Sequence, residues 1–193
     1  MENNIYKIVF LGESGVGAKT SLINQLVNKK FDENVESTTA SCYSYLYIET
    51  DLGIINLDLW DTPGQELYRE IAKNFILNCH CVILGYDITS YDSFKQIKEY
   101  HYNNVKKILR YKPLIYLVAN KIDRIGEEKV SEKEAIEYAK EKDIKYFRIS
   151  ARTGEGINEL LENIVNSLIN KYMDNKINIK EKIEIILKKY YNY

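Results

Sequence analysis

The residues Gly12-Glu-Ser-Gly-Val-Gly-Ala-Lys-Thr20 carry the strongest structural signal in this sequence. They connect an apolar run of strand length, Tyr6 to Leu11, to the segment 20–27, whose apolar residues recur at the spacing of one helix face. A glycine-rich turn between a strand and a helix lets consecutive backbone N–H groups point at a phosphate. A lysine at its end reaches the outer phosphates of a nucleotide, and the next hydroxyl residue binds Mg²⁺. The stretch therefore predicts a phosphate-binding loop that uses Lys19 and Thr20.

The spacing of this loop departs by one residue from the usual G-x-x-x-x-G-K-[ST], because Ala18 stands between Gly17 and Lys19. Either Ala18 is an extra loop residue and Lys19 keeps its task, or Ala18 occupies the lysine position and the loop lacks its main positive charge. The following helix favours the first register, since sliding it by one residue rotates every side chain by about 100° and turns its apolar face off the core. The residues expected around the nucleotide here are Gly12, Glu13, Ser14, Gly15, Val16, Gly17, Ala18, Lys19, Thr20 and Ser21.

Apolar runs of strand length alternate along the chain with amphipathic stretches of helix length, which is typical of a mostly parallel sheet covered by helices. Tyr43 to Thr50 and Ile54 to Trp60 alternate at period two around a short turn and predict an antiparallel hairpin at the sheet edge. Three further buried strands are predicted at Cys81 to Asp87, Leu114 to Asn120 and Tyr146 to Ser150. We therefore predict an α/β fold with a six-stranded, mostly parallel sheet and about five flanking helices.

Two helices have clear local signals. Ser131 and Glu134 have the spacing of a capping box, which satisfies two backbone donors at a helix start. The last helix of the domain carries an apolar stripe at helical period, formed by Ile157, Leu160, Leu161, Ile164, Val165 and Leu168. We expect one domain over residues 1–172 and a tail over 173–193 that includes apolar residues at helical spacing.

Composition excludes several classes of protein. The chain of 193 residues has room for one α/β domain. Its apolar runs are far shorter than the ~20 residues of a membrane span. Its three cysteines, an odd number, favour a reducing cytosol over a disulfide framework. The net charge of −1 divides into 6 basic and 13 acidic residues in 1–94, and 21 basic and 15 acidic residues in 95–193.

Three more polar segments follow predicted strands. Asp61 ends a strand, where its carboxylate can hold Mg²⁺ through water, Gly64 offers an N–H to the γ-phosphate, and Gln65 is placed to orient an attacking water. In the segment Asn120-Lys121-Ile-Asp123, the aspartate can accept hydrogen bonds from the N1–H and 2-amino groups of guanine, which adenine lacks. After the last strand, the backbone N–H groups of Ser150, Ala151 and Arg152 can meet the guanine O6.

These four motifs, in this order and roughly this spacing over about residues 5–172, resemble the small GTPases of the Ras superfamily, closest to the Rab group. The resemblance implies a three-layer P-loop GTPase fold that binds GTP and GDP with Mg²⁺ and hydrolyses GTP slowly as a molecular switch in vesicle trafficking. By the same resemblance, Phe31 packs on the guanine and Thr38 of switch I joins Thr20 and Asp61 around Mg²⁺. Both positions, counted from Lys19, fit only if Ala18 is the inserted residue.

The resemblance also implies partners. An exchange factor, a GTPase-activating protein and effectors would bind through switch I (about residues 32–43) and switch II (about 62–77). The aromatic triad of Rab-type proteins would be Tyr43, Trp60 and Phe75. The resemblance implies a cytoplasmic protein peripheral to endomembranes. No nucleic-acid partner is expected, because Tyr43, Tyr45 and Tyr47 on one strand face suit an amphipathic surface better than a platform for bases. No cysteine stands at the C-terminal end of the sequence, where Rab-type chains usually carry prenylated ones, so membrane association is expected to be indirect.

An alternative from a different class stays open on the sequence. Ala18, the proline Pro63 before Gly64 and the missing lipid site also suit a degenerate GTPase fold that serves as an interaction module with weak or no turnover. An ATP-using P-loop enzyme is disfavoured by Asp123. His101 lies in a polar helical stretch, where we expect it to be solvated.

Overall fold

The computed structural model describes residues 4–16, 18–32, 42–51, 53–62 and 74–172. Within these residues the six strands are β1 (Asn4–Leu11), β2 (Cys42–Thr50), β3 (Gly53–Asp61), β4 (Cys81–Asp87), β5 (Leu114–Asn120) and β6 (Lys145–Arg148). The α-helices are α1 (Thr20–Asn28), α3 (Tyr91–Gln96), α4 (Tyr102–Ile108), α5 (Glu132–Lys142) and α6 (Ile157–Tyr172). A π-helix, η2 (Ile97–His101), joins α3 to α4, and a 3₁₀-helix, η3 (Ile122–Glu127), follows β5. The predicted tail, 173–193, lies outside the described residues.

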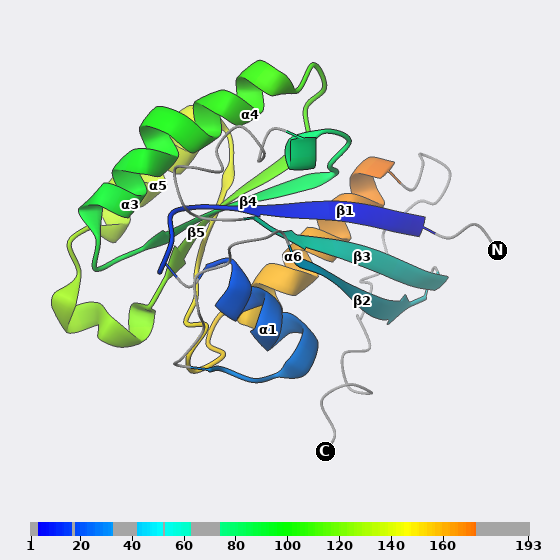
Figure 1. Ribbon diagram of the computed structural model, residues 1–193, viewed down its shortest axis with the longest axis horizontal. Coiled ribbons are helices and arrows are strands. Elements are labelled where there is room, and N and C mark those ends of the chain that lie inside the picture. Colours follow the sequence, from blue (N-terminus) through cyan, green and yellow to red (C-terminus); the bar gives the residue numbers. More distant parts are fainter. Residues whose placement is uncertain (1–3, 17, 33–41, 52, 63–73, 173–193) are drawn as a thin grey trace.

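The strands form one sheet in the order β2-β3-β1-β4-β5-β6, seen nearly edge-on in Figure 1. Strand β2 runs antiparallel to β3, and the pairs β1–β3, β1–β4, β4–β5 and β5–β6 are parallel. The predicted mostly parallel sheet with one antiparallel edge pair is therefore confirmed. Because the five parallel strands point the same way, the segments that follow them meet at one edge of the sheet.

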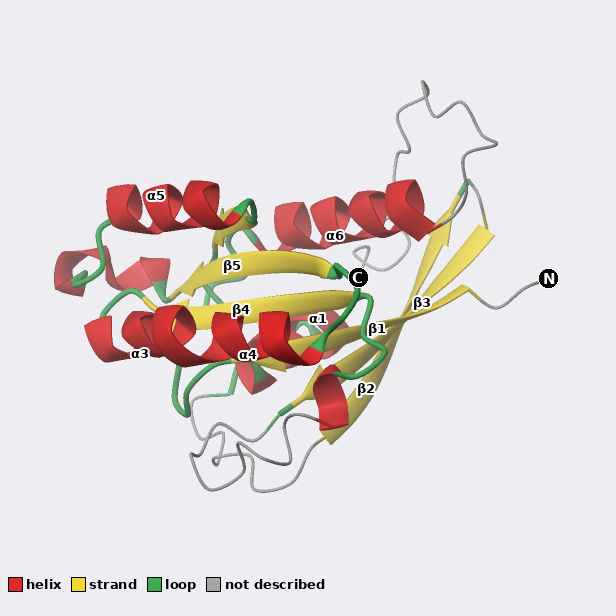
Figure 2. Ribbon diagram, turned by 90° about the horizontal axis from the view of Figure 1, so that it is seen from above, coloured by secondary structure: helices red, strands yellow, loops and turns green. Residues whose placement is uncertain are grey.

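Helices cover both faces of the sheet (Figures 1 and 2). On one face, side chains of β1, β3 and β4 pack in a single core cluster with α1 and α6. On the other face, the alternate side chains of β1, β4 and β5 pack against α3, η2, α4 and α5. The predicted stripes are buried as expected, at Leu22, Ile23 and Leu26 on α1 and at Ile157, Leu160, Leu161, Ile164, Val165 and Leu168 on α6.

Two predictions about single elements need correction. Strand β6 ends at Arg148, because beyond it the backbone turns: Ser150 N donates to Glu155 O at 3.0 Å and Gly154 N donates to Ser150 O at 2.8 Å. At the start of α5, Ser131 caps the helix by accepting from the backbone N–H of Glu134 at 3.2 Å. The Glu134 carboxylate, however, accepts from Lys98 Nζ at 3.0 Å, so it is not directed to the cap as in a full capping box.

Among the helices that the structure describes, none combines the length and the apolar character that a membrane crossing requires.

Candidate functional site

The loop after β1 closes around the side chain of Lys19. The ammonium group of Lys19 donates to the backbone carbonyl of Gly12 at 2.8 Å and to that of Glu13 at 2.6 Å. The loop turns at Gly15, whose φ of +75° is readily adopted by glycine. Lys19 is only 6% exposed, so the loop holds a cation at its centre. Gly17 lies outside the described residues.

Burial of this cation changes its acidity. Removal from water lowers the pKa of Lys19 to about 8, and the carboxylates of Asp61 and Glu13 oppose that change. An anion placed against the loop would favour the charged form. The neighbouring Ala18 is fully buried, so its side chain faces the protein interior and Lys19 supplies the charge of the loop.

Two oxygen-bearing side chains meet beside the lysine. Thr20 opens α1, Asp61 ends β3, and the Thr20 hydroxyl donates to Asp61 Oδ2 at 2.6 Å. Asp61 is 2% exposed. A hydroxyl and a carboxylate are the hard oxygen donors that Mg²⁺ prefers, so the chemistry of this pair fits the ion. The third predicted ligand, Thr38, lies outside the described residues, as do Gly64 and Gln65.

The ends of β5 and β6 are tied to the loop by hydrogen bonds. The side-chain amide of Asn120 donates to Val16 O at 2.9 Å, and its oxygen accepts from Ala151 N at 2.9 Å. The Ser150 hydroxyl donates to Asp123 Oδ1 at 2.6 Å and thereby orients that carboxylate. The structure thus brings together predicted residues from three segments of the chain. Asn120 and Val16, for example, are 104 positions apart in the sequence. Arg152, by contrast, is exposed at the rim.

Lys121 joins the same assembly from an uncommon backbone conformation. Its φ of +69° places it in the left-handed region, and its ammonium group donates to Gly15 O at 2.9 Å. The same group pairs with Asp87 Oδ2 at 2.7 Å. Sequence reasoning missed Asp87, although a carboxylate at the end of the buried strand β4 was a usable signal. Asp87 holds Lys121 across the loop.

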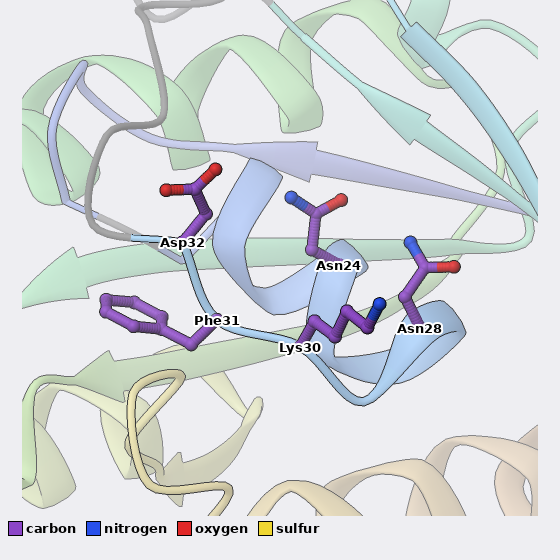
Figure 3. Close-up of a pocket in the computed structure, with 5 residues that line it drawn as sticks. All are labelled: Asn24, Asn28, Lys30, Phe31 and Asp32. Atoms are coloured by element: carbon purple, nitrogen blue, oxygen red, sulfur yellow. The ribbon is translucent and has the colours of Figure 1, made fainter.

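Phe31, predicted from the family to pack on the base, lies beyond the end of α1. It is 37% exposed and lines a pocket of about 540 Å³ together with Asn24, Asn28, Lys30 and Asp32. Figure 3 shows its ring extending away from Asn24 and Asn28 of α1. The ring of Phe31 is therefore accessible to a ligand, in a pocket lined by α1 and the residues that follow it. Ser21, in contrast, is buried within the first turn of α1.

His101 departs from its expected solvated position. Its Nε2 lies 3.2 Å from Glu13 Oε1, and its side chain is 13% exposed. His101 is the last residue of the π-helix η2, and such helices often occur at functional sites. The expectation was wrong because the partner of His101 lies 88 residues away in the phosphate loop. The end of η2 therefore contacts the phosphate loop at Glu13.

A separate aromatic cluster joins Tyr43 of β2 and Trp60 of β3 to Phe75. The ring of Trp60 is 5.4 Å from that of Tyr43 and 5.5 Å from that of Phe75, centroid to centroid. Tyr43 is about half exposed. The structure therefore brings together the three residues expected to face effectors.

A parallel sheet with a glycine-rich loop after its first strand, and polar side chains at the carboxyl ends of its neighbours, defines a P-loop nucleotide-binding protein. Comparison with known proteins refines this class. The sequence model of the Ras family matches residues 7–170. The chain belongs to the Ras family and is a Rab-like small GTPase, an enzyme class that hydrolyses GTP.

Individual relatives agree with this assignment. The chain is 36% identical over 167 residues to GTP-binding protein ypt5 of Schizosaccharomyces pombe, covering 84% of this chain and 77% of ypt5. It is 31% identical over 181 residues to Ras-related protein Rab-7a of Paramecium octaurelia, covering 91% and 87% respectively. It is also 31% identical over 191 residues to GTP-binding protein YPT52 of Saccharomyces cerevisiae, covering 84% and 81%.

Proposed function

We propose that this protein is a GTP/GDP switch that binds its nucleotide with Mg²⁺ and acts in vesicle trafficking at endomembranes. One observation carries the proposal: Asn120 at the end of β5 and the next residue, Lys121, donate hydrogen bonds to Val16 and Gly15 of the phosphate loop. The groups suited to a base and the groups suited to phosphates are therefore parts of one hydrogen-bonded site. A single nucleoside diphosphate or triphosphate can span it.

The base of that nucleotide is guanine in this proposal. One oxygen of Asp123 accepts from the Ser150 hydroxyl at 2.6 Å, which fixes the carboxylate plane. The carboxylate can then accept from the N1–H and the 2-amino group of guanine. Adenine offers neither donor, and it would leave a desolvated carboxylate without its hydrogen bonds. The backbone N–H groups of Ala151 and Arg152 are proposed to serve the guanine O6, and Phe31 the face of the base.

The phosphates are assigned to the loop of residues 12–20, with Lys19 as its cation. We propose that the one-residue insertion in this loop is Ala18, and the hydrogen bonds of Lys19 to the carbonyls at the loop centre support this register. Thr20 and Asp61 would hold Mg²⁺ together with Thr38. Bound Mg²⁺ would neutralise charge on the outer phosphates.

Hydrolysis is assigned to a water molecule oriented by Gln65, with the backbone N–H of Gly64 and the Lys19 ammonium stabilising charge on the γ-phosphate. Intrinsic turnover is expected to be slow, because no arginine of the sequence is an obvious candidate to stabilise the transition-state charge. A GTPase-activating protein would supply that arginine. An exchange factor would release GDP. Effectors would read the bound state through the switches and the surface formed by Tyr43, Trp60 and Phe75.

The hydrolytic role has a direct test. Replacing Gln65 by leucine should slow single-turnover GTP hydrolysis at least about tenfold, since positioning of the attacking water is lost. The affinity for a fluorescent GDP analogue should stay at the wild-type value, which makes GDP binding the internal control. A wild-type hydrolysis rate in the Gln65→Leu variant would remove Gln65 from the mechanism. Tight GDP binding by a wild-type protein without turnover would instead favour the interaction-module alternative.

A further inference from the structure

Gly85 is an unusual residue for its position in the sheet. It lies inside β4, a central strand in which every residue is buried. Glycine weakens a strand interior, and its presence there often marks a site where another backbone approaches closely. The ladder between β1 and β4 ends at the pair Leu11 and Leu84. Gly85 is therefore the first residue of β4 beyond β1, at the point where the chain leaves β1 for the phosphate loop.

Both ends of the phosphate loop approach Gly85. A β-carbon built on Gly85 would lie less than 3.0 Å from the β-carbon of Ala18, 3.2 Å from its carbonyl oxygen and 3.4 Å from its α-carbon. At the other end, a β-carbon built on Gly12 would lie under 3.0 Å from the carbonyl oxygen of Gly85. Real β-carbons essentially never come that close to another atom. Ala18 therefore fills the space that a side chain at position 85 would occupy.

The consequence reaches the groups assigned to the phosphates. Ala18 is fully buried and has no flexible end that could give way. A side chain at position 85 would displace its backbone, and the next two residues would move with it. These are Lys19, which donates to Gly12 O at 2.8 Å, and Thr20, which donates to Asp61 at 2.6 Å. Hydrogen bonds of this length weaken steeply when donor and acceptor are moved or misaligned.

We propose that Gly85 is the positioning residue of the phosphate loop: the absence of a side chain on β4 seats Ala18, and this seat sets Lys19 and Thr20 against the nucleotide phosphates. The inference rests on the proposed nucleotide-binding function of the loop. None of the four sequence motifs includes a residue of β4, so the inference adds a strand that the motifs do not mention.

The test is a double-mutant cycle between the two positions. Gly85→Ala, Ala18→Gly and the double variant are compared with wild type by titration of a fluorescent GDP analogue in millimolar Mg²⁺. Gly85→Ala should lower the affinity at least about tenfold, because charge-assisted hydrogen bonds in the loop are lost. Adding Ala18→Gly removes the nearest clashing atom and should restore most of that affinity, and Ala18→Gly alone is the reference variant that the cycle requires. Residues in contact, or linked through a shared backbone shift, show such coupling, whereas distant and independent residues do not.

The matched control is Gly126→Ala in η3, because a β-carbon there has no heavy atom within 4 Å. It should bind GDP as wild type does. Wild-type affinity in Gly85→Ala, or a loss that Ala18→Gly fails to relieve, would overturn the inference. So would a lower melting temperature with unchanged affinity, which describes a packing role only. If Gly85→Ala does not fold, recovery of folding and GDP binding in the double variant supports the proposal, and failure to recover contradicts it.

The proposed function fails separately. It fails if wild-type protein itself binds no guanine nucleotide, in which case the positioning role for phosphates falls with it. The thermal stabilities of the four proteins in the cycle would then still decide whether Ala18 and Gly85 are in contact.

Discussion

A lysine buried at the centre of a loop is costly, because its charged form is taken out of water. Lys19 tolerates this position through two carbonyl oxygens at 2.8 and 2.6 Å and through the nearby carboxylates of Asp61 and Glu13. The residual cost is visible in the lowered pKa of its ammonium group. An anionic ligand would offset it. These contacts therefore compensate the charge of Lys19 in part, and a bound anion would compensate it further.

Lys19→Met tests the register of the loop. The substitution removes the charge while keeping a long apolar chain, so the affinity for GDP should fall at least about tenfold as charge-assisted contacts are lost. The melting temperature of the nucleotide-free protein should fall by about 2–4 °C, since the carbonyls of Gly12 and Glu13 lose their donor. Fluorescent-GDP titration and a thermal melt measure the two quantities. Lys112→Met is a suitable control, because that side chain is 70% exposed and far from the loop in sequence. Unchanged affinity in Lys19→Met would place Ala18 in the lysine position.

The same lysine predicts a dependence on pH. With a pKa of about 8, Lys19 loses its proton as the pH rises through 8 in the nucleotide-free protein. Bound phosphates favour the charged form, so GDP binding above pH 8 should take up a proton, and affinity should weaken as the pH rises further. Calorimetric titration at pH 9 in two buffers of different ionisation enthalpy measures that uptake. Lys19→Met should abolish it. Proton-neutral binding by the wild-type protein would contradict the assignment.

At the scale of elements, the strands show what a sequence can reveal. Both β4 and β5 were predicted residue for residue, because each is a continuous apolar run that ends at a polar side chain. Strand β6 was predicted too long, since the turn that ends it depends on hydrogen bonds to Gly154 and Glu155. The π-helix η2 was not predicted, because its five residues are too few to show a period of their own. The contact of His101 with Glu13 was missed because the two residues lie 88 positions apart.

The N-terminus of α5 gives a test at this scale. Ser131 accepts a hydrogen bond from the Glu134 backbone N–H at 3.2 Å. Ser131→Ala should lower the free energy of unfolding by about 1 kcal/mol. For a chain of this length, that corresponds to a fall of about 2–4 °C in melting temperature. Lys133→Ala, an exposed change in the same helix, is the control and should stay within about 0.5 kcal/mol of wild type. Equal effects of the two substitutions would remove the cap from the account.

At the scale of the whole molecule, most of the candidate site could be predicted from topology alone. Asp61 and Asn120 end strands, and Ser150 follows a strand, that are parallel in one sheet, so these residues meet at one edge. The contacts of His101 and Gly85 could not be predicted, because each depends on how a distant segment packs against the loop. Each motif is a short run of consecutive residues that can be read from the sequence. The residues that hold the motifs in place lie far from them along the chain.

The distribution of charge adds a requirement at this scale. Residues 1–94, which include the phosphate loop, carry 6 basic and 13 acidic residues. Lys19 is the only basic residue between Lys7 and Lys29. Besides Lys19 and Lys121, backbone N–H groups and Mg²⁺ would supply positive potential for the phosphates. We expect nucleotide affinity to depend strongly on Mg²⁺.

The central claim is that this site selects guanine nucleotides with Mg²⁺. It is tested most directly by displacing a bound fluorescent GDP analogue with unlabelled GTP or ATP, with and without chelation of Mg²⁺. GTP should displace the analogue, ATP should be weaker by about 10⁴-fold, and chelation should accelerate release. In Asp123→Asn, preference should pass to xanthosine diphosphate, whose 2-oxygen can accept from the new amide. Equal displacement of the wild-type complex by ATP and GTP would contradict the account.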